Sequence, residues 1–496
     1  MLATPNGNML WTCDPSIIKQ LFTLQTIRLP VDMFAFFDMF GPTLGSVDGD
    51  EWKVHRKVVT HGLGPSLLPV MWKETIKQTH GLVQLWKDSG EEYGEKGCGE
   101  VGVVKEWTSR LALHVLAGVM FGKELLWGEY KKDGDDAAGK KELGEDEEEI
   151  SFQSALFTFV ARMGLIFITP RLLLNTLPIK ACREVSRALS HFTSSMQGLR
   201  AQALSNIHEK APSNRRKTIL ESIAIAGSMD SLPEASVLGN IYFTLMAGHE
   251  TTGSALGFSM LLLAIYPEYQ IKIHNQLDSL FDKREEAEWN VEHDYPALKK
   301  GYMGHFIKEV LRAYCPLQFG LRRAIAPTTL TDSHGQAHMV PADTLCLVNF
   351  AAAFQNPSTF SPRANMSASR KEALHHSPAI DFDPDRWAGD RTEGFEASEG
   401  SDAVLHIPFG HGARKCPGQP FAQVEIVAFL ASLLKGNSVE LAVDDGVLLG
   451  ECGGDKEKAW ETTRDDAIRK MKDEVTFGIT LQMLEKLPLR VVTRGD

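Results

Sequence analysis

The amino-acid sequence predicts a mainly α-helical protein with a minor β-sheet portion. Apolar residues recur at the helical spacing of three and four residues over several long segments. Strand-like runs are short and few by comparison. The chain is 43% hydrophobic and 23% charged, which is the composition of a globular protein and excludes a disordered or collagen-like one.

The helical pattern is strongest in four segments: Glu106–Phe121, about Pro233–Ile265, Tyr302–Tyr314 and Phe421–Leu434. The second is the longest, and Pro267 ends it because proline cannot continue a helix. Its central part is apolar on nearly all sides, so we expect a buried helix that crosses the domain. The predicted strands are four short runs: Thr344–Leu347, Val439–Val443, Phe477–Leu481 and Leu489–Val492.

No internal repeat is visible in the 496 residues, and we expect residues 1–496 to form a single domain. Charged surface inserts interrupt it near 131–149, 363–378 and 450–473. The first is a mixed and then acidic run, which is typical of a solvated loop. Strongly patterned sequence resumes on both sides of each insert, so none of them indicates a linker between independent domains.

Charge and cysteine content narrow the classes of function. The net charge is −12, which disfavours a nucleic-acid partner because phosphate binding requires a basic face. The seven cysteines are scattered, which indicates a reducing compartment and argues against a structural zinc cage. A membrane-spanning helix needs about 20 apolar residues in succession. The best candidate, Ala155–Ile179, contains Arg162, Pro170 and Arg171, so we expect no membrane span.

A glycine-rich loop, Phe409–Gly418, presents a single thiol, Cys416, just before a helix that begins near Gln419. The positive end of a helix dipole and its free amide donors favour a thiolate. Such a thiolate can be a nucleophile, a redox sensor or an axial metal ligand, whereas an arbitrary cysteine is more often part of the core. The glycines let the backbone approach a flat and bulky group closely.

The long helix contains the sequence AGHETT over Ala247–Thr252. A glycine in the middle of a helix, followed by an acid and a hydroxyl, is an unfavourable combination for a helix, so we expect a local distortion with a function. A zinc motif H-E-x-x-H is excluded because position 253 is glycine. In the alternative interpretation, Thr251 and Thr252 bond back to helix carbonyls while Glu250 pairs with a cation.

These segments resemble the signature motifs of the cytochromes P-450, the haem-thiolate monooxygenases. The loop matches F-G-x-G-x-R-x-C-x-G at every defining position, and AGHETT is similar to the oxygen-binding motif of the family. Glu309–Arg312 and Phe382–Trp387 resemble its E-x-x-R and F-x-P-x-R-[FW] boxes, and Trp52–Arg56 resembles its W-x-x-x-R helix. E-x-x-R and W-x-x-x-R also occur elsewhere in this chain, so the order of the motifs carries the assignment.

The resemblance implies the family's fold, with a long central helix over a haem b that is held by the cysteine loop. Cys416 would be the iron ligand, and the further cofactor-binding residues would be Phe409, Gly412, Arg414, Gly418, Trp52, Arg56 and Arg322. Thr251 would hydrogen-bond dioxygen and Glu250 would relay protons, as the catalytic pair. Glu309, Arg312 and Arg386 would form a buried charge network behind the haem.

The implied reaction inserts one oxygen atom from O₂ into a small lipophilic substrate. Electrons would come from NADPH through a flavoprotein reductase that docks near Arg414 and Lys415. Two alternatives stay open: a haem-thiolate isomerase or dehydratase of the same fold, and an inactive or sensor haem protein. Apolar residues that could line the substrate pocket are Met33, Phe34, Phe36, Phe37, Met39, Phe40, Phe243, Met246, Leu317, Phe319 and Phe477–Thr480.

The large inserts suggest a eukaryotic, fungal-like member of the family. Such members act at the cytosolic face of the endoplasmic reticulum. Fewer residues precede Trp52 than family members usually carry, so we expect a shortened N-terminal sheet and anchor region. We therefore expect no membrane anchor in this chain, and at most a peripheral contact with the membrane.

Overall fold

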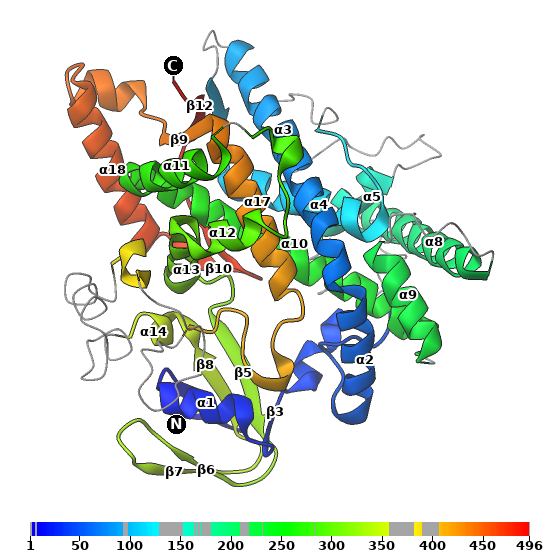
Figure 1. The fold of residues 1–496 in the computed structure, drawn as a ribbon. Coiled ribbons are helices and arrows are strands. Elements are labelled where there is room, and N and C mark those ends of the chain that lie inside the picture. The colour runs from blue at the N-terminus through cyan, green and yellow to red at the C-terminus, as the bar shows by residue number, and fades with distance from the viewer. Residues whose placement is uncertain are drawn as a thin grey trace. The chain divides into compact units, whose positions relative to one another are not determined.

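The computed structural model gives a helical protein with small sheets, as the sequence predicts (Figure 1). The described residues are 2–4, 7–92, 98–127, 152–162, 165, 169, 180–208, 218–230, 232–282, 284–356, 381–388 and 406–495. The predicted inserts at 131–149 and 363–378 lie outside these residues. Most of the third, at 450–473, forms a helix (Lys456–Asp473).

The chain divides into two compact units, and the boundary falls inside two helices. One unit contains residues 1–30, 68–113 and 247–496, and the other contains 31–67 and 114–246. The two helices shared by both units are α4 (Val104–Phe121) and α10 (Glu234–Ile265). That residues 1–496 form a single domain stays a prediction.

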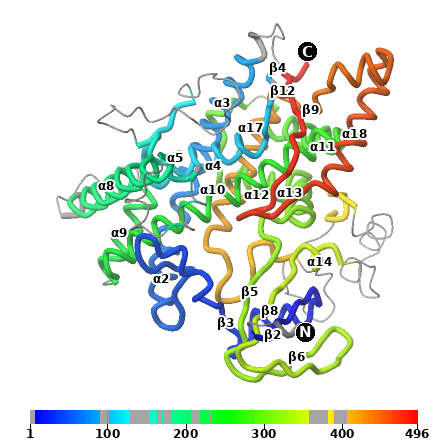
Figure 2. Tube along the Cα trace, turned by 180° about the vertical axis from the view of Figure 1, so that it is seen from behind, coloured from blue at the N-terminus to red at the C-terminus, as the bar shows by residue number. Residues whose placement is uncertain are grey.

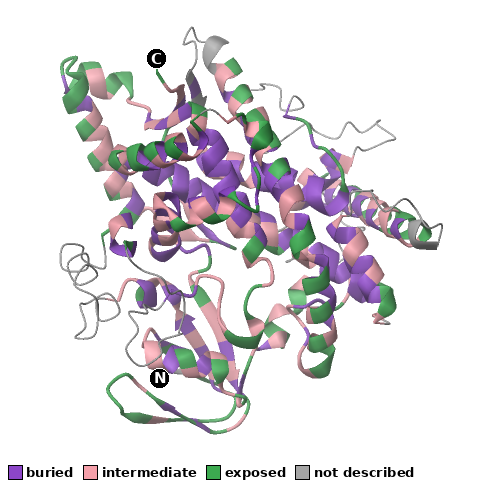
Figure 3. Cartoon of the chain, viewed as in Figure 1, coloured by how far each residue is buried: buried purple, intermediate pink, exposed green. Residues whose placement is uncertain are grey.

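The remaining helices of the first unit are α1 (Pro15–Thr23), α3 (Leu68–Glu92), α11 (Pro267–Phe281), α12 (Asp294–Lys300), α13 (Tyr302–Ala313), α14 (Phe350–Phe354), α17 (Gln419–Gly436) and α18 (Lys456–Asp473). Helix α17 is apolar around most of its circumference and packs against α3, α11 and α12. Figure 3 shows it buried along most of its length. This buried helix anchors the cysteine loop that precedes it.

All described strands belong to the first unit. The largest sheet has the order β1 (Leu2–Thr4), β2 (Gly7–Thr12), β8 (Leu345–Asn349), β5 (Phe319–Ala324) and β3 (Ile27–Arg28). Figure 2 shows the N-terminal strands β2 and β3 beside β8 and β5. Residues 2–28 thus supply three strands of this sheet, two on the β8 side and one at the opposite edge.

Three smaller sheets complete the unit. They are β4 (Cys98–Val101) with β12 (Leu489–Thr493) and β9 (Asn437–Leu441), β6 (Thr328–Thr331) with β7 (Ala337–Val340), and β10 (Val475–Phe477) with β11 (Leu481–Met483). The strand predicted over Phe477–Leu481 is wrong, because Gly478–Thr480 form the turn of the β10–β11 hairpin. Phe477, Ile479 and Leu481 alternate with Gly478 and Thr480 in the sequence, and such alternation occurs in a strand as well as across a tight hairpin.

The second unit is built around α2 (Gly49–Gly62), α5 (Phe152–Ala161), α8 (Lys180–His208) and α9 (Ile219–Met229), with the N-terminal part of α10. Aromatic rings fill its core: Phe40 and Phe159 pack against Tyr242 with ring centroids 5.0 and 5.7 Å apart. A capping box of Thr218 and Glu221 begins α9.

The predicted long helix is observed as α10, and it is α-helical throughout Ala247–Thr252. The expected distortion at this motif is therefore wrong. Burial of an almost wholly apolar helix offsets the low helix propensity of its glycines. No helix of the described residues has both the length and the apolar character needed to span a membrane.

Candidate functional site

The loop before α17 carries Cys416 on its surface. Three backbone hydrogen bonds fix the loop: Gly410 N to Ile407 O (2.9 Å), Lys415 N to Gly412 O (3.1 Å) and Cys416 N to Phe409 O (2.9 Å). The last of these joins the two ends of the motif. The loop therefore presents an exposed thiol from a fixed backbone, three residues before the first turn of a buried helix.

Two glycines of the loop occupy the left-handed region, Gly410 and Gly412, each with φ of 71°. A Cβ atom at Gly412 would lie 2.6 Å from the carbonyl oxygen of Phe22 on α1. A side chain there would collide with backbone, so only glycine allows both the conformation and the approach. A Cβ at Gly418 would lie 3.8 Å from Cys416 Sγ, in ordinary contact.

Arg322, on β5, is a buried cation close to the cysteine loop. Its guanidinium lies over the ring of Phe22, 4.1 Å from the centroid, and Nη1 donates to the carbonyl of Leu321 at 2.8 Å. Burial, and then repulsion by Arg414, lowers the pKa of Arg322 to about 10. Within the described residues no carboxylate pairs with Arg322. Two arginines that repel one another form a site for an anion.

Glu309, on α13, is the centre of a buried charge network with Arg312 and Arg386. Arg312 donates to the carboxylate from Nε at 2.7 Å and from Nη2 at 2.8 Å. Arg386, in the 3₁₀ turn Pro384–Trp387, donates from Nε at 2.9 Å. All three side chains are fully buried. The structure thus brings together the three residues that the E-x-x-R and F-x-P-x-R motifs indicate.

The Glu309 carboxylate accepts two further hydrogen bonds that the motifs do not specify. Asp383 N donates at 2.8 Å and Trp387 Nε1 at 2.9 Å, so five donors of the described residues surround it. Burial raises the pKa of Glu309, but the two arginines and the hydrogen bonds outweigh burial and hold it below its usual value. The network connects α13 with the segment around Pro384–Trp387, and both arginines also donate to Asp381 O.

Thr251 and Glu250 lie on α10, in the part that belongs to the first unit. Thr251 Oγ1 donates to the carbonyl of Ala247 at 2.8 Å. The Glu250 carboxylate forms an ion pair with Lys105 of α4 at 2.7 Å. Both contacts are those of the alternative interpretation, but neither prevents a catalytic role, because the threonine oxygen and the carboxylate both keep lone pairs free to accept.

Trp52 and Arg56 lie on α2, in the second unit. They line an open hollow of about 810 Å³ together with Lys53, Lys57 and His61. His55, on the same helix, is buried and its ring pairs with Asn240. The cysteine loop, Arg322, the Glu309 network, Thr251 and Glu250 all lie in the first unit.

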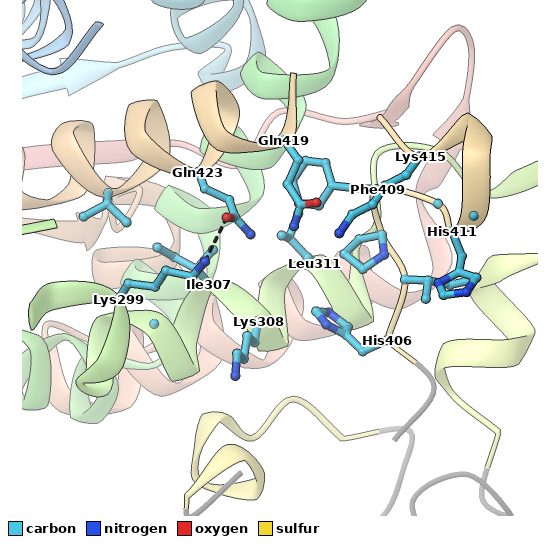
Figure 4. Close-up of a pocket in the computed structure, with 16 residues that line it drawn as sticks. Lys299, Ile307, Lys308, Leu311, His406, Phe409, His411, Lys415, Gln419 and Gln423 are labelled. Atoms are coloured by element: carbon cyan, nitrogen blue, oxygen red, sulfur yellow. Dashed lines mark hydrogen bonds between the residues drawn. The ribbon is translucent and has the colours of Figure 1, made fainter. Parts of the chain in front are cut away.

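Behind the cysteine loop is a pocket of about 210 Å³ between α12, α13 and α17 (Figure 4). Lys299, Lys308 and Lys415 line it, together with His406 and His411. Lys299 Nζ donates to Gln423 at 2.9 Å. None of the residues that line the pocket is acidic, so its surface is electropositive although the chain as a whole is acidic.

Some of the residues expected to line the substrate pocket belong to the first unit and the others to the second. In the first unit, Phe319 packs against Phe477 with ring centroids 4.9 Å apart, and Phe319 and Leu317 are partly exposed. In the second unit, Phe37 contacts Phe243 edge-on at 5.3 Å, whereas Phe40 belongs to the aromatic core. Phe477 belongs to the β10–β11 hairpin, and Thr480 of the same hairpin contacts Glu250.

Comparison with known proteins decides the family. A model described as "Cytochrome P450" matches residues 40–451, which is more than half of the chain. The chain belongs to the cytochrome P450 family. A crystal structure of a cytochrome P450 shares its fold, with a TM-score of 0.62 and 17% identity over 98% of this chain and 89% of that chain.

Two curated relatives of this P450 are fungal. One is a phomenoic acid biosynthesis cluster cytochrome P450 monooxygenase of Leptosphaeria maculans, 24% identical over 87% of this chain and 73% of its own length. The other is cytochrome P450 monooxygenase 124 of Postia placenta, 26% identical over 85% of this chain and 73% of its own length. The predicted fold and the predicted enzyme class, an oxidoreductase of the P450 monooxygenase type, are confirmed.

The family implies a haem cofactor, and the residues of this P450 fit one. Haem carries two carboxylates, and Arg322, buried beside Arg414, is a cation that pairs with no carboxylate of the described residues. Haem iron takes an axial thiolate in this family, and Cys416 offers an exposed thiol on a fixed loop. The family also implies a redox partner, O₂ and a lipophilic substrate in general terms.

Sequence reasoning missed Lys105 and Gln482, and it gave Thr480 only as a residue that could line the substrate pocket, although all three surround Glu250. Lys105, Thr480 and Gln482 are 145, 230 and 232 residues away from it in the chain, and no motif connects them. The one available signal is the pair Gly253 and Gly257 on α10, whose spacing places both on one helix face and indicates close contact with another element.

Proposed function

We propose that this P450 inserts one oxygen atom from O₂ into a small lipophilic substrate, and that the thiolate of Cys416 would bind the haem iron. The single observation that carries the proposal is the loop itself. It holds an exposed thiol by three backbone hydrogen bonds, close to the buried Arg322, which pairs with no carboxylate of the described residues.

Several residues would hold the haem. Cys416 would bind the iron, and Arg322 and Arg414 would pair with the haem carboxylates. Gly412 lets the loop approach the backbone of Phe22, Gly418 lies beside the thiol, and the carbonyl oxygen of Phe409 accepts a hydrogen bond from Cys416 N. Their resemblance to the family's W-x-x-x-R helix makes Trp52 and Arg56 further candidates to bind the carboxylates. When bound, the haem supplies electron transfer and activation of dioxygen, which no protein side chain provides.

The protons for this chemistry would pass through Glu250 and Thr251. The hydroxyl of Thr251 donates to Ala247 O and keeps its oxygen free to accept from another donor. The Glu250 carboxylate is 17% exposed, so it can exchange protons with solvent, and it is adjacent to Thr251 in the chain. The residues thus place an acid with access to water next to a hydroxyl that can pass a proton on.

The substrate would be lipophilic, and the Phe319–Phe477 pair with Leu317 would form part of its site. Aromatic and aliphatic lining favours apolar ligands. The relative from the phomenoic acid cluster supports a secondary metabolite as the substrate class. A screen of lipophilic metabolites for ligand-induced shifts in the haem absorption spectrum would identify candidates.

NADPH would supply electrons one at a time through a flavoprotein reductase. The electropositive pocket behind the cysteine loop, with Lys299, Lys308 and Lys415, would receive acidic side chains of the reductase. We place the enzyme at the cytosolic face of the endoplasmic reticulum. Exposed apolar side chains near the large sheet, Trp11, Ile325 and Met339, support a peripheral contact with a lipid surface.

The test is turnover by the purified, haem-loaded chain with a substrate from the screen. The proposal expects product only when NADPH, a reductase and O₂ are all present. Product formed without reductase and O₂ would instead indicate a haem-thiolate isomerase or dehydratase. Binding of haem and ligand with no turnover of any screened compound under either condition would favour a sensor.

A further inference from the structure

An ion pair joins two helices at the carboxylate of Glu250. Lys105, in the first turn of α4, donates from Nζ to Glu250 Oε1 of α10 at 2.7 Å. The two side chains are 23% and 17% exposed, so the pair is mostly but not completely shielded from solvent. An ion pair in such a setting is screened less than a surface pair and is correspondingly stronger.

Two glycines of α10 allow α4 to approach closely enough for this contact. A Cβ at Gly253 would lie 2.6 Å from Ser109 Cα, and a Cβ at Gly257 would lie 3.2 Å from Thr108 Oγ1. Thr108 Oγ1 also donates to Gly253 O at 2.8 Å, which fixes the register of the two helices. In this register the backbone of Lys105 lies beside Gly257, with its Cα 3.7 Å from a Cβ built there, and its side chain extends to Glu250.

The β10–β11 hairpin is the third element, after α10 and α4, that contacts the Glu250 carboxylate or its lysine partner. Ser254 of α10 donates from Oγ to Leu481 O at 2.8 Å, which ties the hairpin to the helix. The fully buried Thr480 then donates from Oγ1 to Glu250 Oε1 at 3.0 Å. Gln482 accepts from Lys105 Nζ at 2.7 Å. Lys105 is therefore held by two acceptors, one on each of its neighbouring elements.

The charges around Glu250 keep its carboxylate ionised. Burial alone would raise its pKa, but the ammonium of Lys105, then His249, and the hydrogen bonds from Lys105 and Thr480 outweigh burial and lower it. His249 is the other titratable neighbour, on α10 itself, with Nε2 3.9 Å from Oε2. Thr480 and Gln482 of the hairpin carry no charge, so Lys105 is the principal cation at this carboxylate.

We propose that Lys105 is a positioning residue that fixes the Glu250 carboxylate at the junction of α4, α10 and the β10–β11 hairpin and so sets its availability for proton transfer. The inference rests on the proposed role of Glu250 in proton delivery. Lys105 does not touch Thr251; it acts through Glu250. Removing its charge leaves a largely buried carboxylate without its main counter-ion, which then takes up a proton at a higher pH.

The experiment compares haem-loaded Lys105→Met, which keeps the length of the chain and loses the charge, with Lys105→Arg, which keeps the charge. The first readout is the infrared carboxyl band of Glu250 across pH, assigned by its absence in Glu250→Gln. We expect Lys105→Met to move protonation of Glu250 to higher pH, and Lys105→Arg to restore most of the wild-type profile. Thr480→Val should also move the protonation of Glu250 to higher pH, but by a smaller amount.

The second readout is product formed per NADPH consumed. We expect Lys105→Met to lower this ratio by about threefold to tenfold, less than the loss in Glu250→Gln, because a positioned acid–base group contributes about 10²–10⁴ in rate. The control is Lys470→Met on α18, which removes a lysine of similar exposure, 19%, that bridges Asp466 and Glu485. It should change neither readout.

An unchanged Glu250 titration in Lys105→Met would overturn the positioning role. Thr480→Val provides the same test should Lys105→Met not fold, because an unchanged titration there removes the proposed junction. A shifted titration together with unchanged product per NADPH in Glu250→Gln would support the ion pair but contradict the proposed role of Glu250 in catalysis. The two failures are therefore distinguishable.

Discussion

Glu309 and Glu250 are both ionised carboxylates of the first unit, but their surroundings differ. Glu309 is fully buried, pairs with two arginines and accepts five hydrogen bonds. Glu250 is 17% exposed, pairs with one lysine and accepts two hydrogen bonds from the described residues, one from Lys105 and one from Thr480. A carboxylate has about four lone-pair sites, so the first is saturated while the second keeps acceptor capacity.

The difference separates a structural charge from one that can react. The Glu309 carboxylate is fully buried and all its acceptor positions are used, so it cannot gain a proton without breaking several contacts at once. Its role is therefore to connect α13 with the Pro384–Trp387 turn. Glu250 is partly exposed, so it can exchange a proton with water by breaking only one or two contacts. Proton transfer is therefore expected at Glu250 and a role in folding and haem retention at Glu309.

Among the predicted changes, Arg386→Ala is expected to have the largest effect on stability and haem binding. It removes one of the two cations from a fully buried carboxylate, which costs about 3–5 kcal/mol. We expect the variant to lose stable haem incorporation, measured as haem bound per protein after purification. Arg469→Ala is the control, because Arg469 is 53% exposed and pairs with Asp466 and Glu474 on the surface. Full haem occupancy of Arg386→Ala would show that Glu309 does not depend on its second arginine.

Thr251→Ala should affect the partly exposed site around Glu250 and leave the buried charge network of Glu309 intact. We expect normal haem content but about tenfold less product per NADPH consumed, with the lost electrons recovered as hydrogen peroxide, because a proton donor has been removed. Ser259→Ala is matched to it, since Ser259 Oγ donates to the carbonyl of Ala255 on the same helix at 2.7 Å. Coupling that is equal in the two variants would argue that Thr251 only bonds back to its helix.

The lysines that line the pocket behind the cysteine loop are expected to form ion pairs with another protein, the reductase. Lys308→Glu reverses a charge at this pocket, and we expect roughly threefold to tenfold weaker apparent affinity for the reductase, with the difference shrinking at high salt. The measurement is the reductase concentration for half-maximal turnover. Lys458→Glu, on the exposed side of α18, should have no such effect. A salt-independent loss in Lys308→Glu would indicate damage to the fold and not a docking contact.

Glu425 on α17 is a third kind of carboxyl, buried with no hydrogen bond to Oε1 in the described residues. Burial raises its pKa well above the usual value, so the folded state binds its proton more tightly than the unfolded state does. Stability is then lost as pH rises above the ordinary carboxyl pKa toward the raised one.

We therefore expect Glu425→Gln to raise the melting temperature by roughly 2–4 °C near neutral pH, and by less under acid conditions. Calorimetry of both proteins at several pH values measures this smallest of the predicted effects. A variant that melts lower than the wild type at neutral pH would mean that Glu425 has a favourable partner and that the contrast among the three carboxyls is wrong.

The sequence predicts the long helices well because each buries a broad apolar stripe. Tyr302–Tyr314 differs from α13 by one residue, and Phe421–Leu434 extends by two residues at each end in α17. The hairpin turn at Gly478–Thr480 was missed because alternation alone does not distinguish a strand from a tight turn. The motif residues around Glu309 could be predicted because their order along the chain is informative.

The surroundings of Glu250 could not be predicted in the same way. A lysine 145 residues earlier and a threonine 230 residues later meet it only through packing of α4 and the β10–β11 hairpin against α10. The glycines at 253 and 257 indicate that something approaches the helix, but not which element or which side chain. Long-range contacts between charged side chains depend on tertiary packing, which local patterns do not specify.

The most direct test of the whole account is the absorption spectrum of the purified, reduced protein treated with carbon monoxide, compared with that of Cys416→Ala. We expect the spectrum of a thiolate-bound haem in the wild type and its loss in the variant. A wild-type protein that stays colourless when given haem, or a variant that keeps the same spectrum, would contradict Cys416 as the ligand.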